Sequence, residues 1–392
     1  MPDILLSIII PTKNRIETAR YAIQTALTVT APDMEIIVQD CSDTDELKAY
    51  IDSLSDSRVK YFFQNDPISM TENWNRAYSH ANGEYMIGIG DDDAVFPEVY
   101  TVAEWAFENK LEAVGQTEPY QYFWGNFPEV AIQKRLFLKS FTGNVSVHTD
   151  LLSTVLKRSK FADDGYARDL PMVYHRLISK KTLQQLQSVT GKLLDGTSLD
   201  VYSSFAIGLI CKQFVILDYP FSMRGASGKS NSGRFVVKQD KQHFDEFSFI
   251  SYPEWLPKIP FVNVSIAESI CKAFTQTGHE DLISNISKPY LYAVIIAERP
   301  DLKEDIMSGF VSRYLETDAE KAEFHSLYKK LKAGKNEKKW RLLAEKINMV
   351  IPVLSLYRKI IRKKDIRLND TMEVLDFHKQ YIAENGISLK LN

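Results

Sequence analysis

The chain of 392 residues has only three cysteines, Cys41, Cys211 and Cys271, and they lie far apart. An odd number of widely spaced cysteines gives neither a disulfide framework nor a zinc-site spacing, and it predicts a reducing, cytoplasmic location. No run of 18 apolar residues occurs, so we expect no membrane-spanning helix. The N-terminal MPDILLSIIIP lacks a basic segment, and its short apolar run ends at Pro11, so we expect no signal peptide.

An excess of charge of one sign is also missing from the chain as a whole, whose net charge is −3 at pH 7. This average hides a basic segment, because residues 329–364 hold 13 Lys/Arg and two Asp/Glu while the rest is acidic. A chain with this balance is not a globally basic nucleic-acid binder, so we expect no nucleic-acid partner.

The basic segment has two interpretations. Residues 338–364 mix Trp, Leu, Ile and Val with Lys and Arg at roughly helical spacing, and Pro352 interrupts them. Basic amphipathic helices lie on anionic membranes, which predicts a peripheral contact with the inner face of the membrane. Such a helix equally well packs its apolar side on the rest of the chain or on a partner subunit of a homo-oligomer.

Short apolar runs alternate with helical patterns in the first part of the chain. The predicted strands are 5–11, 35–40, 59–64 and 84–90, and the predicted helices between them are 16–29, 44–54 and 71–81. This alternation predicts an α/β fold with a mostly parallel central sheet covered by helices. Beyond about residue 240 the patterns are mainly helical, so we predict a domain over residues 1–235 and a helical C-terminal region over 236–392.

Polar residues follow three of the predicted strands directly, at Thr12–Arg15, Asp40–Ser42 and Asp91–Asp93. In open α/β sheets, ligands bind beyond the carboxyl ends of the strands. No G-x-G-x-x-G or Walker A sequence follows the first strand, so neither a dinucleotide site nor a P-loop is predicted.

The three adjacent aspartates in YMIGIGDDDAVFP (85–97) are the most unusual of these strand ends. A carboxylate cluster can hold a hard divalent cation such as Mg²⁺ or Mn²⁺, which takes oxygen ligands and often shares them with phosphates. The alternative is a solvated turn whose aspartates precede a helix opened by Pro97.

Four stretches together resemble the family 2 glycosyltransferases of the GT-A fold. They are SIIIPTKNR (7–15), EIIVQDCSDTDEL (35–47), MTENWNRAYSHANGEYMIGIGDDDAVFP (70–97) and, more loosely, SLDVYSSFAIGLICKQFVILDYPF (198–221). The resemblance implies a GT-A domain over 1–235. It also implies an inverting enzyme that uses Mn²⁺ or Mg²⁺ to transfer a sugar from a nucleotide sugar, with UDP as the expected nucleotide.

The resemblance also implies where the donor binds. Pro11, Thr12 and Arg15 stand where the family cradles the nucleotide, and Asp40 stands where an aspartate binds the uracil ring. The base preference stays open, because the chain has Gln39 and Cys41 where the family often has Asp and Gly. Asn75 matches a common asparagine of the family, and it completes the expected donor-binding set with Asp91 and Asp92.

The family's D-x-D motif falls on Gly90, Asp91 and Asp92, so glycine replaces its first aspartate. The resemblance assigns Asp92 to the metal and Asp91 to the ribose or the donor sugar. Asp93 is a second candidate for the metal site. The matching position for the catalytic base is Asp200, where Leu199 replaces a usual glutamate; alternatively, Asp200 only favours the helix dipole.

Two loops complete the predicted site. MRGASGKSNSGR (223–234) suits a loop that wraps phosphates, and a plain linker explains it equally well. Its candidate phosphate contacts are Arg224, Ser227, Lys229 and Ser230. KFADDGYARDLPMVYHR (160–176) is expected on the acceptor side, although surface charges on a loop also explain it. Its candidate acceptor contacts are Asp163, Asp164, Arg168, His175 and Arg176.

These observations favour a glycosyltransferase that extends a bacterial-type surface polysaccharide, similar to O-antigen or capsule, on a saccharide or lipid-linked saccharide acceptor. The alternative is a catalytically silent saccharide-binding or scaffolding subunit that keeps the fold. A nucleotidyltransferase is disfavoured, because its glycine- and lysine-rich first loop is absent. The sequence does not specify the sugar, the acceptor or the linkage.

Overall fold

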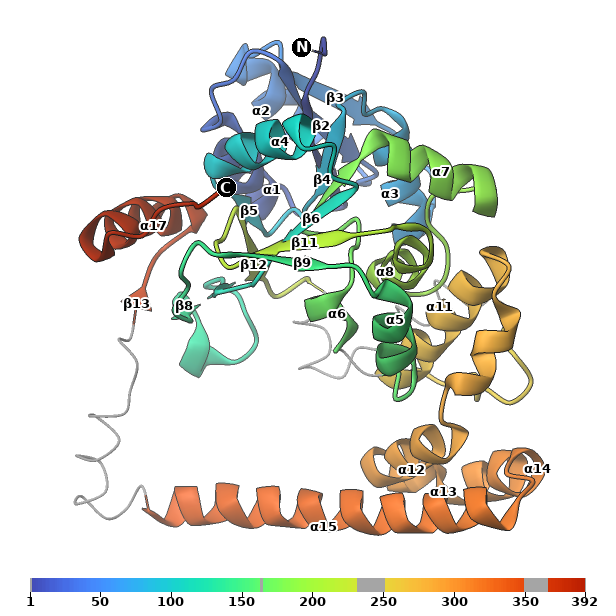
Figure 1. The fold of residues 1–392 in the computed structure, drawn as a ribbon. Helices are drawn as coiled ribbons and strands as arrows, with labels where there is room; N and C mark the ends of the chain where they lie inside the picture. Colours follow the sequence, from blue (N-terminus) through green and yellow to red (C-terminus); the bar gives the residue numbers. More distant parts are fainter. Residues whose placement is uncertain (1, 163–164, 231–250, 349–365, 392) are drawn as a thin grey trace.

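The computed structural model describes residues 2–162, 165–230, 251–348 and 366–391. Its centre is a mixed eight-stranded sheet (Figure 1). The strands, in spatial order, are β3 (Val59–Phe63), β2 (Met34–Asp40), β1 (Leu6–Thr12), β4 (Tyr85–Gly88), β10 (Leu177–Ser179), β6 (Ala113–Gln116), β11 (Phe214–Leu217) and β9 (Val145–His148).

Most strand pairs of this sheet are parallel. Strands β3, β2, β1 and β4 run in the same direction, and β6 runs parallel to β11. Strand β10 is antiparallel to both β4 and β6, and β9 is antiparallel to β11. The predicted α/β fold with a mostly parallel sheet is therefore confirmed.

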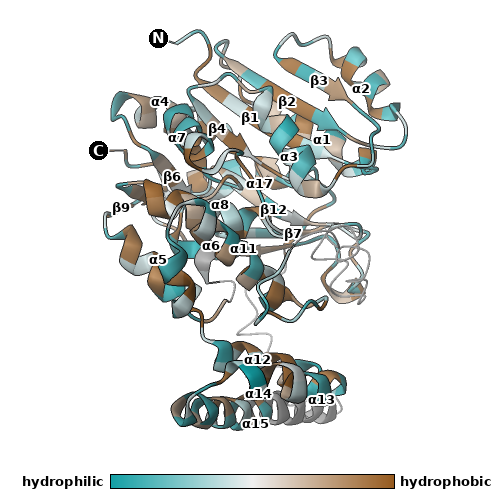
Figure 2. Cartoon of the chain, turned by 90° about the vertical axis from the view of Figure 1, so that its right-hand side faces the viewer, coloured by the Kyte–Doolittle hydropathy of each residue, from teal (hydrophilic) through white to brown (hydrophobic). Residues whose placement is uncertain are grey.

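Helices cover both faces of the sheet, and the strands supply apolar side chains to each face in turn. Along β1, Ile8 and Ile10 pack in one core and Ile9 in the other, as the two-residue period of a strand requires. Figure 2 shows hydrophobic residues gathered in these central strands. The first core contains α1 (Ile16–Leu27), α2 (Glu46–Leu54), α4 (Glu98–Glu108) and α17 (Thr371–Asn385). The second contains α3 (Met70–Ser79), α5 (Leu151–Ser159), α7 (Lys180–Thr190), α8 (Leu199–Ile210) and α11 (Val262–Gln276).

A second, five-stranded sheet holds the segment that follows the aspartates. Its order is β13 (Ile366–Arg367), β8 (Arg135–Leu138), β7 (Tyr120–Phe123), β12 (Ser222–Ala226) and β5 (Ala94–Val95). Strand β5 begins directly after Asp93 and pairs with β12, which in turn runs parallel to β7. The aspartates therefore lie where the two sheets meet.

The described part of the C-terminal region is mainly helical, as the sequence predicts. Helices α12 (Lys288–Glu298), α13 (Lys303–Ile306) and α14 (Ser312–Tyr314) lie along the long α15 (Asp318–Asn348), below the α/β part (Figure 1). The end of the chain then returns to the first domain, because β13 pairs with β8 and α17 packs against α1. The predicted boundary at 235 falls outside the described residues and stays a prediction.

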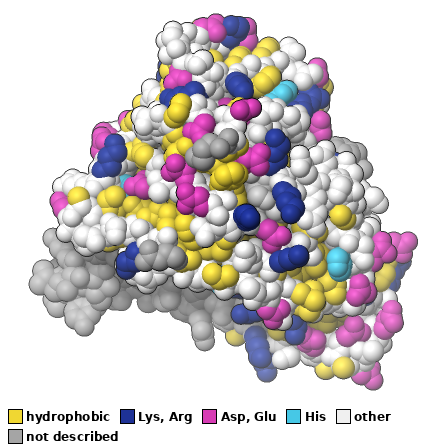
Figure 3. All heavy atoms as spheres, turned by 45° about the horizontal axis from the view of Figure 1, so that its top comes forward, with side chains coloured by type: hydrophobic (Ala, Val, Ile, Leu, Met, Phe, Trp, Pro, Cys, Tyr) yellow, Lys and Arg dark blue, Asp and Glu magenta, His cyan; other side chains and the backbone are white. Residues whose placement is uncertain are grey.

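The basic segment 338–364 lies largely outside the described residues, which include only the backbone of its first part within α15. None of the described helices is both long and apolar enough to cross a membrane. On the face shown in Figure 3, acidic and basic side chains of the described residues are interspersed, and neither sign gathers into one large patch. This distribution agrees with the charge balance of the sequence.

Candidate active site

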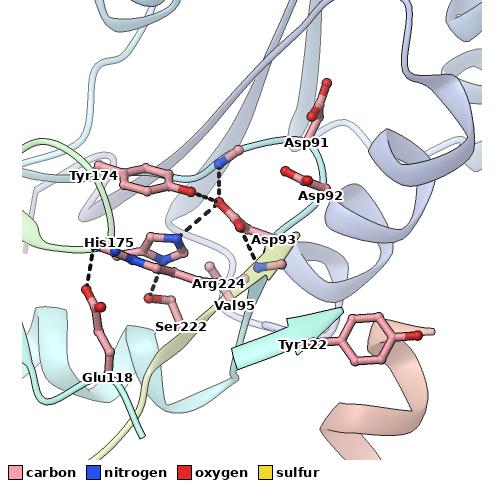
Figure 4. A network of polar contacts seen from close by, with 12 residues as sticks. Asp91, Asp92, Asp93, Val95, Glu118, Tyr122, Tyr174, His175, Ser222 and Arg224 are labelled. Carbon is pink, nitrogen blue, oxygen red and sulfur yellow. Dashed lines mark hydrogen bonds and ion pairs between the residues drawn. The ribbon is translucent and has the colours of Figure 1, made fainter. Parts of the chain in front are cut away.

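The centre of the site is a turn of three buried carboxylates, Asp91, Asp92 and Asp93, after strand β4. Their exposed fractions are 0%, 4% and 0%. Adjacent carboxylates resist burial unless cations or hydrogen-bond donors compensate their charge. Figure 4 shows that Asp93 forms its own network, while Asp91 and Asp92 lie outside it.

The end of strand β1 compensates the first two aspartates. Thr12 donates a hydrogen bond to Asp91 Oδ2 at 2.6 Å, and the Arg15 guanidinium lies 2.8 Å from Asp91 Oδ1. Arg15 also lies 3.6 Å from Asp92 Oδ1. Burial nevertheless raises the pKa of Asp91 to about 7 and raises the pKa of Asp92, although Arg15 opposes both shifts. The structure thus brings together four residues of the predicted donor site, with Pro11 next to Thr12 in the same strand.

Asp93 differs from its neighbours because four donors fill its two oxygens. Oδ2 accepts from the Gly90 N–H at 2.6 Å and the Tyr174 hydroxyl at 2.7 Å, and it lies 3.0 Å from His175 Nε2. Oδ1 accepts from the Gly225 N–H at 2.7 Å. Burial alone would raise the pKa of Asp93, but His175 and Tyr174 outweigh it and hold the pKa below its ordinary value. Asp93 therefore organises the turn, and its predicted metal role is replaced by a structural one.

Two of the predicted acceptor residues are internal. His175 is fully buried between Asp93 and Ser222, whose Oγ lies 2.9 Å from His175 Nδ1. Arg176 is also buried, 3.2 Å from Glu118. Neither side chain can reach an acceptor in this arrangement, which corrects the sequence-based assignment. Arg168 is exposed, and Asp163 and Asp164 lie outside the described residues.

The predicted phosphate loop reaches the aspartate turn. The Ser227 N–H donates to Asp92 Oδ2 at 2.9 Å, and Ser230 Oγ donates back to the Ser227 carbonyl at 2.7 Å. Lys229 Nζ donates to the carbonyl of Asn14, beside Arg15, at 3.0 Å. Ser227 and Lys229 therefore bring an N–H donor and a cation close to Asp92 and the carboxyl end of β1, which suits an anionic ligand.

Arg224, which precedes this loop, has a different setting. It lies over the ring of Tyr174 and 2.8 Å from Glu118, which also pairs with Arg176. Burial would raise the pKa of Glu118, but Arg224 and Arg176 hold it below the ordinary value. Arg224 thus supports Tyr174 and through it the Asp93 network, and a direct phosphate contact stays a prediction.

Two glycines permit the close approach of these segments. A Cβ atom on Gly90 would lie 2.9 Å from Asp93 Oδ2, so glycine at this position of the D-x-D motif leaves room for the Asp93 network. A Cβ atom on Gly225 would lie 1.7 Å from the backbone oxygen of Asp92. Strand β12 can therefore lie this close to the turn only with glycine at position 225.

Gly225→Ala is accordingly expected to push β12 away from the turn and to break the bond to Asp93. Overpacking of this kind costs about 1–3 kcal/mol of the free energy of unfolding, and denaturant titration measures it. Gly309→Ala is the matched control, because a Cβ atom there meets nothing within 4 Å. Equal, small effects of the two substitutions would contradict this account of β12.

The side chains of Asp40 and Asn75 form hydrogen bonds with other residues of the chain. Asp40 is buried at the end of β2, where it accepts from the Ser42 N–H and the Tyr61 hydroxyl, both at 2.9 Å. Its contact with a nucleobase stays a prediction. The Asn75 side chain exchanges two hydrogen bonds of 2.9 Å with the backbone of Leu194, so it holds the loop that leads into α8.

Asp200 lies half-buried in the first turn of α8, as predicted. Helix α8 is tied to the aspartate turn, because Ser203 Oγ accepts from the Val173 N–H at 3.3 Å and Val173 precedes Tyr174 and His175. The helix that carries the candidate base is thus linked through one short segment to Asp93.

Sequence reasoning missed Tyr174, Glu118 and Ser222. Trp124, which the sequence offers either as a sugar-stacking residue or as a buried aromatic, is buried and donates its Nε1–H to the backbone oxygen of Asp92 at 2.8 Å. These residues come from strands and loops that no local pattern connects to the aspartates. Their only signal was the presence of Tyr174 within the 160–176 stretch already singled out.

The fit of a divalent cation depends on Asp92. Among the described residues, no group of three His, Cys, Asp or Glu side chains is arranged to hold a metal by itself. Mg²⁺ in phosphate sites usually takes only one or two carboxylates and completes its shell with water and substrate phosphates. Asp92 Oδ1, with Asp91 Oδ1 beside Arg15, offers such a partial set, so the residues present fit this kind of site.

Comparisons with known proteins give matches to part of the chain. Residues 7–155 match the family model "Glycosyl transferase family 2". A colanic acid biosynthesis glycosyl transferase of Escherichia coli, described as putative, is 37% identical over 100 residues, which is 25% of this chain and 36% of that protein. A Campylobacter jejuni GalNAc(5)-diNAcBac-PP-undecaprenol beta-1,3-glucosyltransferase is 36% identical over 91 residues, 22% of this chain and 29% of that protein. The predicted resemblance to family 2 glycosyltransferases is therefore confirmed, and the family model matches residues 7–155.

These similarities are partial. The chain spans only about a third of the length of the curated relatives that it matches. Among solved structures, Staphylococcus aureus TarS 1–349 in complex with UDP-GlcNAc is 12% identical with a TM-score of 0.44, over 86% of this chain and 92% of that one. A structure of S. aureus TarS also at 12% identity has a TM-score of 0.46, over 84% of this chain and 55% of that one.

Proposed function

We propose that the chain is an inverting, metal-dependent glycosyltransferase that moves a sugar from a nucleotide sugar, with UDP the expected nucleotide. The observation that carries the proposal is the convergence of Asp91 and Asp92 with Arg15 and the 224–230 loop. Buried carboxylates beside cations and N–H donors suit a ligand that combines phosphates with a hard cation.

The donor half of the site would hold the diphosphate. Arg15 and Lys229 would bind phosphate oxygens, since Arg15 lies beside Asp92 and Lys229 reaches the carbonyl of Asn14. Mn²⁺ or Mg²⁺, held by Asp92 with Asp91 beside it, would stabilise the negative charge that grows on the leaving diphosphate. Arg15 supplies positive charge to the same carboxylates.

The acceptor half of the site depends on Asp200. A carboxylate in the first turn of α8 can take the proton of an acceptor hydroxyl as that oxygen attacks the anomeric carbon. Attack of the acceptor on the face opposite the leaving diphosphate inverts the configuration of the sugar. Asp200 is half-buried, and in this proposal its carboxylate would face the bound saccharide.

The names of the relatives support a role in polysaccharide synthesis, since one is named for colanic acid and one for an undecaprenol-linked saccharide. We therefore propose a saccharide or lipid-linked saccharide acceptor at the inner face of the membrane, reached through residues 338–364.

Flotation with anionic and neutral vesicles tests the membrane contact. Equal binding to both kinds of vesicle, or none to either, would reject it.

A screen of the purified protein against UDP-, GDP- and dTDP-sugars, with Mn²⁺ or Mg²⁺, tests the proposal. Release of a nucleoside diphosphate from one donor is the expected result, and that donor identifies the nucleotide and the sugar. A protein that binds saccharides and releases no nucleotide from any donor would instead be the silent binding or scaffolding subunit.

A further inference from the structure

A buried glutamate of the C-terminal region contacts the start of the helix that carries Asp200. Glu268, on α11, is 1% exposed. Its Oε2 accepts from the N–H and from the hydroxyl of Thr197, both at 2.9 Å. Carboxylates are rarely buried to this degree unless they have a specific partner. Here the partner is the residue just before Ser198, the N-cap of α8.

The next residue of α11 completes this contact. Ser269 Oγ accepts from the Ser198 N–H at 3.0 Å and donates to Glu268 Oε2 at 3.2 Å. The side chain of Ser198 itself makes no capping hydrogen bond. Helix N-termini need acceptors for their first N–H groups, and α11 brings acceptors to the residues at which α8 begins.

The loop of residues 194–198, here called the lead-in, is held from the opposite side by α3. Asn75 exchanges two hydrogen bonds with Leu194, and Thr71 donates to the Gly196 carbonyl at 3.2 Å. On the α11 side, Lys272 and Gln276 bind the Asp195 carboxylate at 3.1 and 2.6 Å. The lead-in is therefore clamped between the first domain and the C-terminal region.

We propose that Glu268 is a positioning residue for Asp200: it fixes the start of α8 so that the Asp200 carboxylate faces the acceptor. The proposal rests on the proposed function, because it takes Asp200 as the base. It gives α11 a part in the reaction, since the same helix α8 is bonded through Ser203 to the segment that holds Asp93.

The contacts also show which atom of Glu268 the lead-in uses. Within the lead-in, Glu268 Oε2 accepts both hydrogen bonds from Thr197, whereas Oε1 has no hydrogen-bond partner among the described residues. Burial raises the pKa of Glu268, although Thr197 and Lys272 oppose the shift. One acceptor oxygen is thus what the lead-in requires, and a glutamine amide can supply it.

The test compares two substitutions. Glu268→Gln keeps an acceptor oxygen for Thr197, whereas Glu268→Met keeps the length of the side chain but has no acceptor oxygen. Misplacing a catalytic group by about 1 Å can cost about 10²-fold, so we expect kcat to fall by about 10- to 100-fold in Glu268→Met. Glu268→Gln should stay near wild-type kcat. The donor dissociation constant, measured by calorimetry with the nucleoside diphosphate, should be unchanged in both, because the contacts of Glu268 are to Thr197 and Ser269 and not to the proposed donor residues.

Glu35→Met is the matched control for structural damage. Glu35 is also 1% exposed and binds Ser7 and Asn82, at the opposite ends of the strands from the aspartate turn. The Glu35→Met substitution should lower the free energy of unfolding and leave kcat unchanged at a temperature where the protein is folded. Ser269→Ala, a smaller change in the same contact, keeps the test decisive if Glu268→Met does not fold; it should lower kcat with donor affinity unchanged.

Hydrogen exchange adds a readout that does not depend on turnover. The amides of residues 194–204 should exchange faster in Glu268→Met or Ser269→Ala, with the exchange of β1 and β4 unchanged. Wild-type kcat in both of these variants, or an equal loss of kcat in Glu35→Met, would overturn the positioning role. A wild-type protein that releases no nucleotide from any donor would overturn the proposed function itself, which is a different result.

Discussion

Asp92→Asn is expected to abolish sugar transfer and to leave the fold intact. Asparagine keeps the shape of the side chain and an oxygen for the Ser227 N–H, but it loses the charge that a divalent cation needs. Metal stabilisation of the leaving group contributes several kcal/mol, so the rate should fall by about 10³-fold or more. Nucleotide release in the presence of Mn²⁺ measures this loss.

Thermal denaturation provides the control for folding of the Asp92→Asn protein. Burial disfavours the charged form of Asp92, so the neutral amide should not lower the melting temperature appreciably. Asp45→Asn, an exposed aspartate after strand β2 whose side chain caps no helix, should keep full activity. Full activity of Asp92→Asn, or of the wild type in EDTA, would reject the metal role.

Asp200→Asn should reduce turnover by about 10²–10⁴-fold, the usual contribution of general-base catalysis. The amide cannot take a proton from the acceptor hydroxyl, whereas the donor contacts around Arg15 and Asp92 are untouched. Calorimetry with the nucleoside diphosphate should therefore give an unchanged dissociation constant. Asp281→Asn, an exposed change in the C-terminal region, serves as the control.

A collapse of donor affinity in Asp200→Asn would place Asp200 in the donor site. An unchanged turnover would instead show that Asp200 only favours the dipole of α8. The two outcomes contradict the base assignment in different ways, because the first lowers donor affinity whereas the second leaves both donor affinity and turnover unchanged.

The parts of the fold that depend on local patterns were predictable. The apolar runs that form β1 to β4 are long and β-branched, and the helices between them have clear periods, so the predicted 16–29 and 44–54 correspond to Ile16–Leu27 and Glu46–Leu54. The second sheet was not predictable, because strands as short as Ala94–Val95 and Ile366–Arg367 carry no pattern. The return of α17 to α1 joins residues hundreds of positions apart, and a single sequence gives no sign of such a contact.

The residues of the candidate site also fall into those that could be predicted from the sequence and those that could not. Thr12, Arg15, Asp91 and Asp92 follow parallel strands, and the carboxyl ends of such strands meet, so their convergence follows from the sheet. The inward position of His175 could not be predicted, because it accompanies a left-handed backbone at φ +57° that no sequence pattern specifies. The use of Asn75 on the Leu194 backbone likewise depends on how two distant segments pack.

The identity of the bond that breaks in the donor tests the central claim most directly. The nucleotide product of the wild-type protein, incubated with the active nucleotide sugar and Mn²⁺, can be identified by liquid chromatography or ³¹P NMR. A glycosyltransferase cleaves the bond between the anomeric carbon and the phosphate oxygen, so we predict a nucleoside diphosphate and no sugar 1-phosphate. A nucleoside monophosphate together with a sugar 1-phosphate, or no cleavage of any donor, would contradict the account.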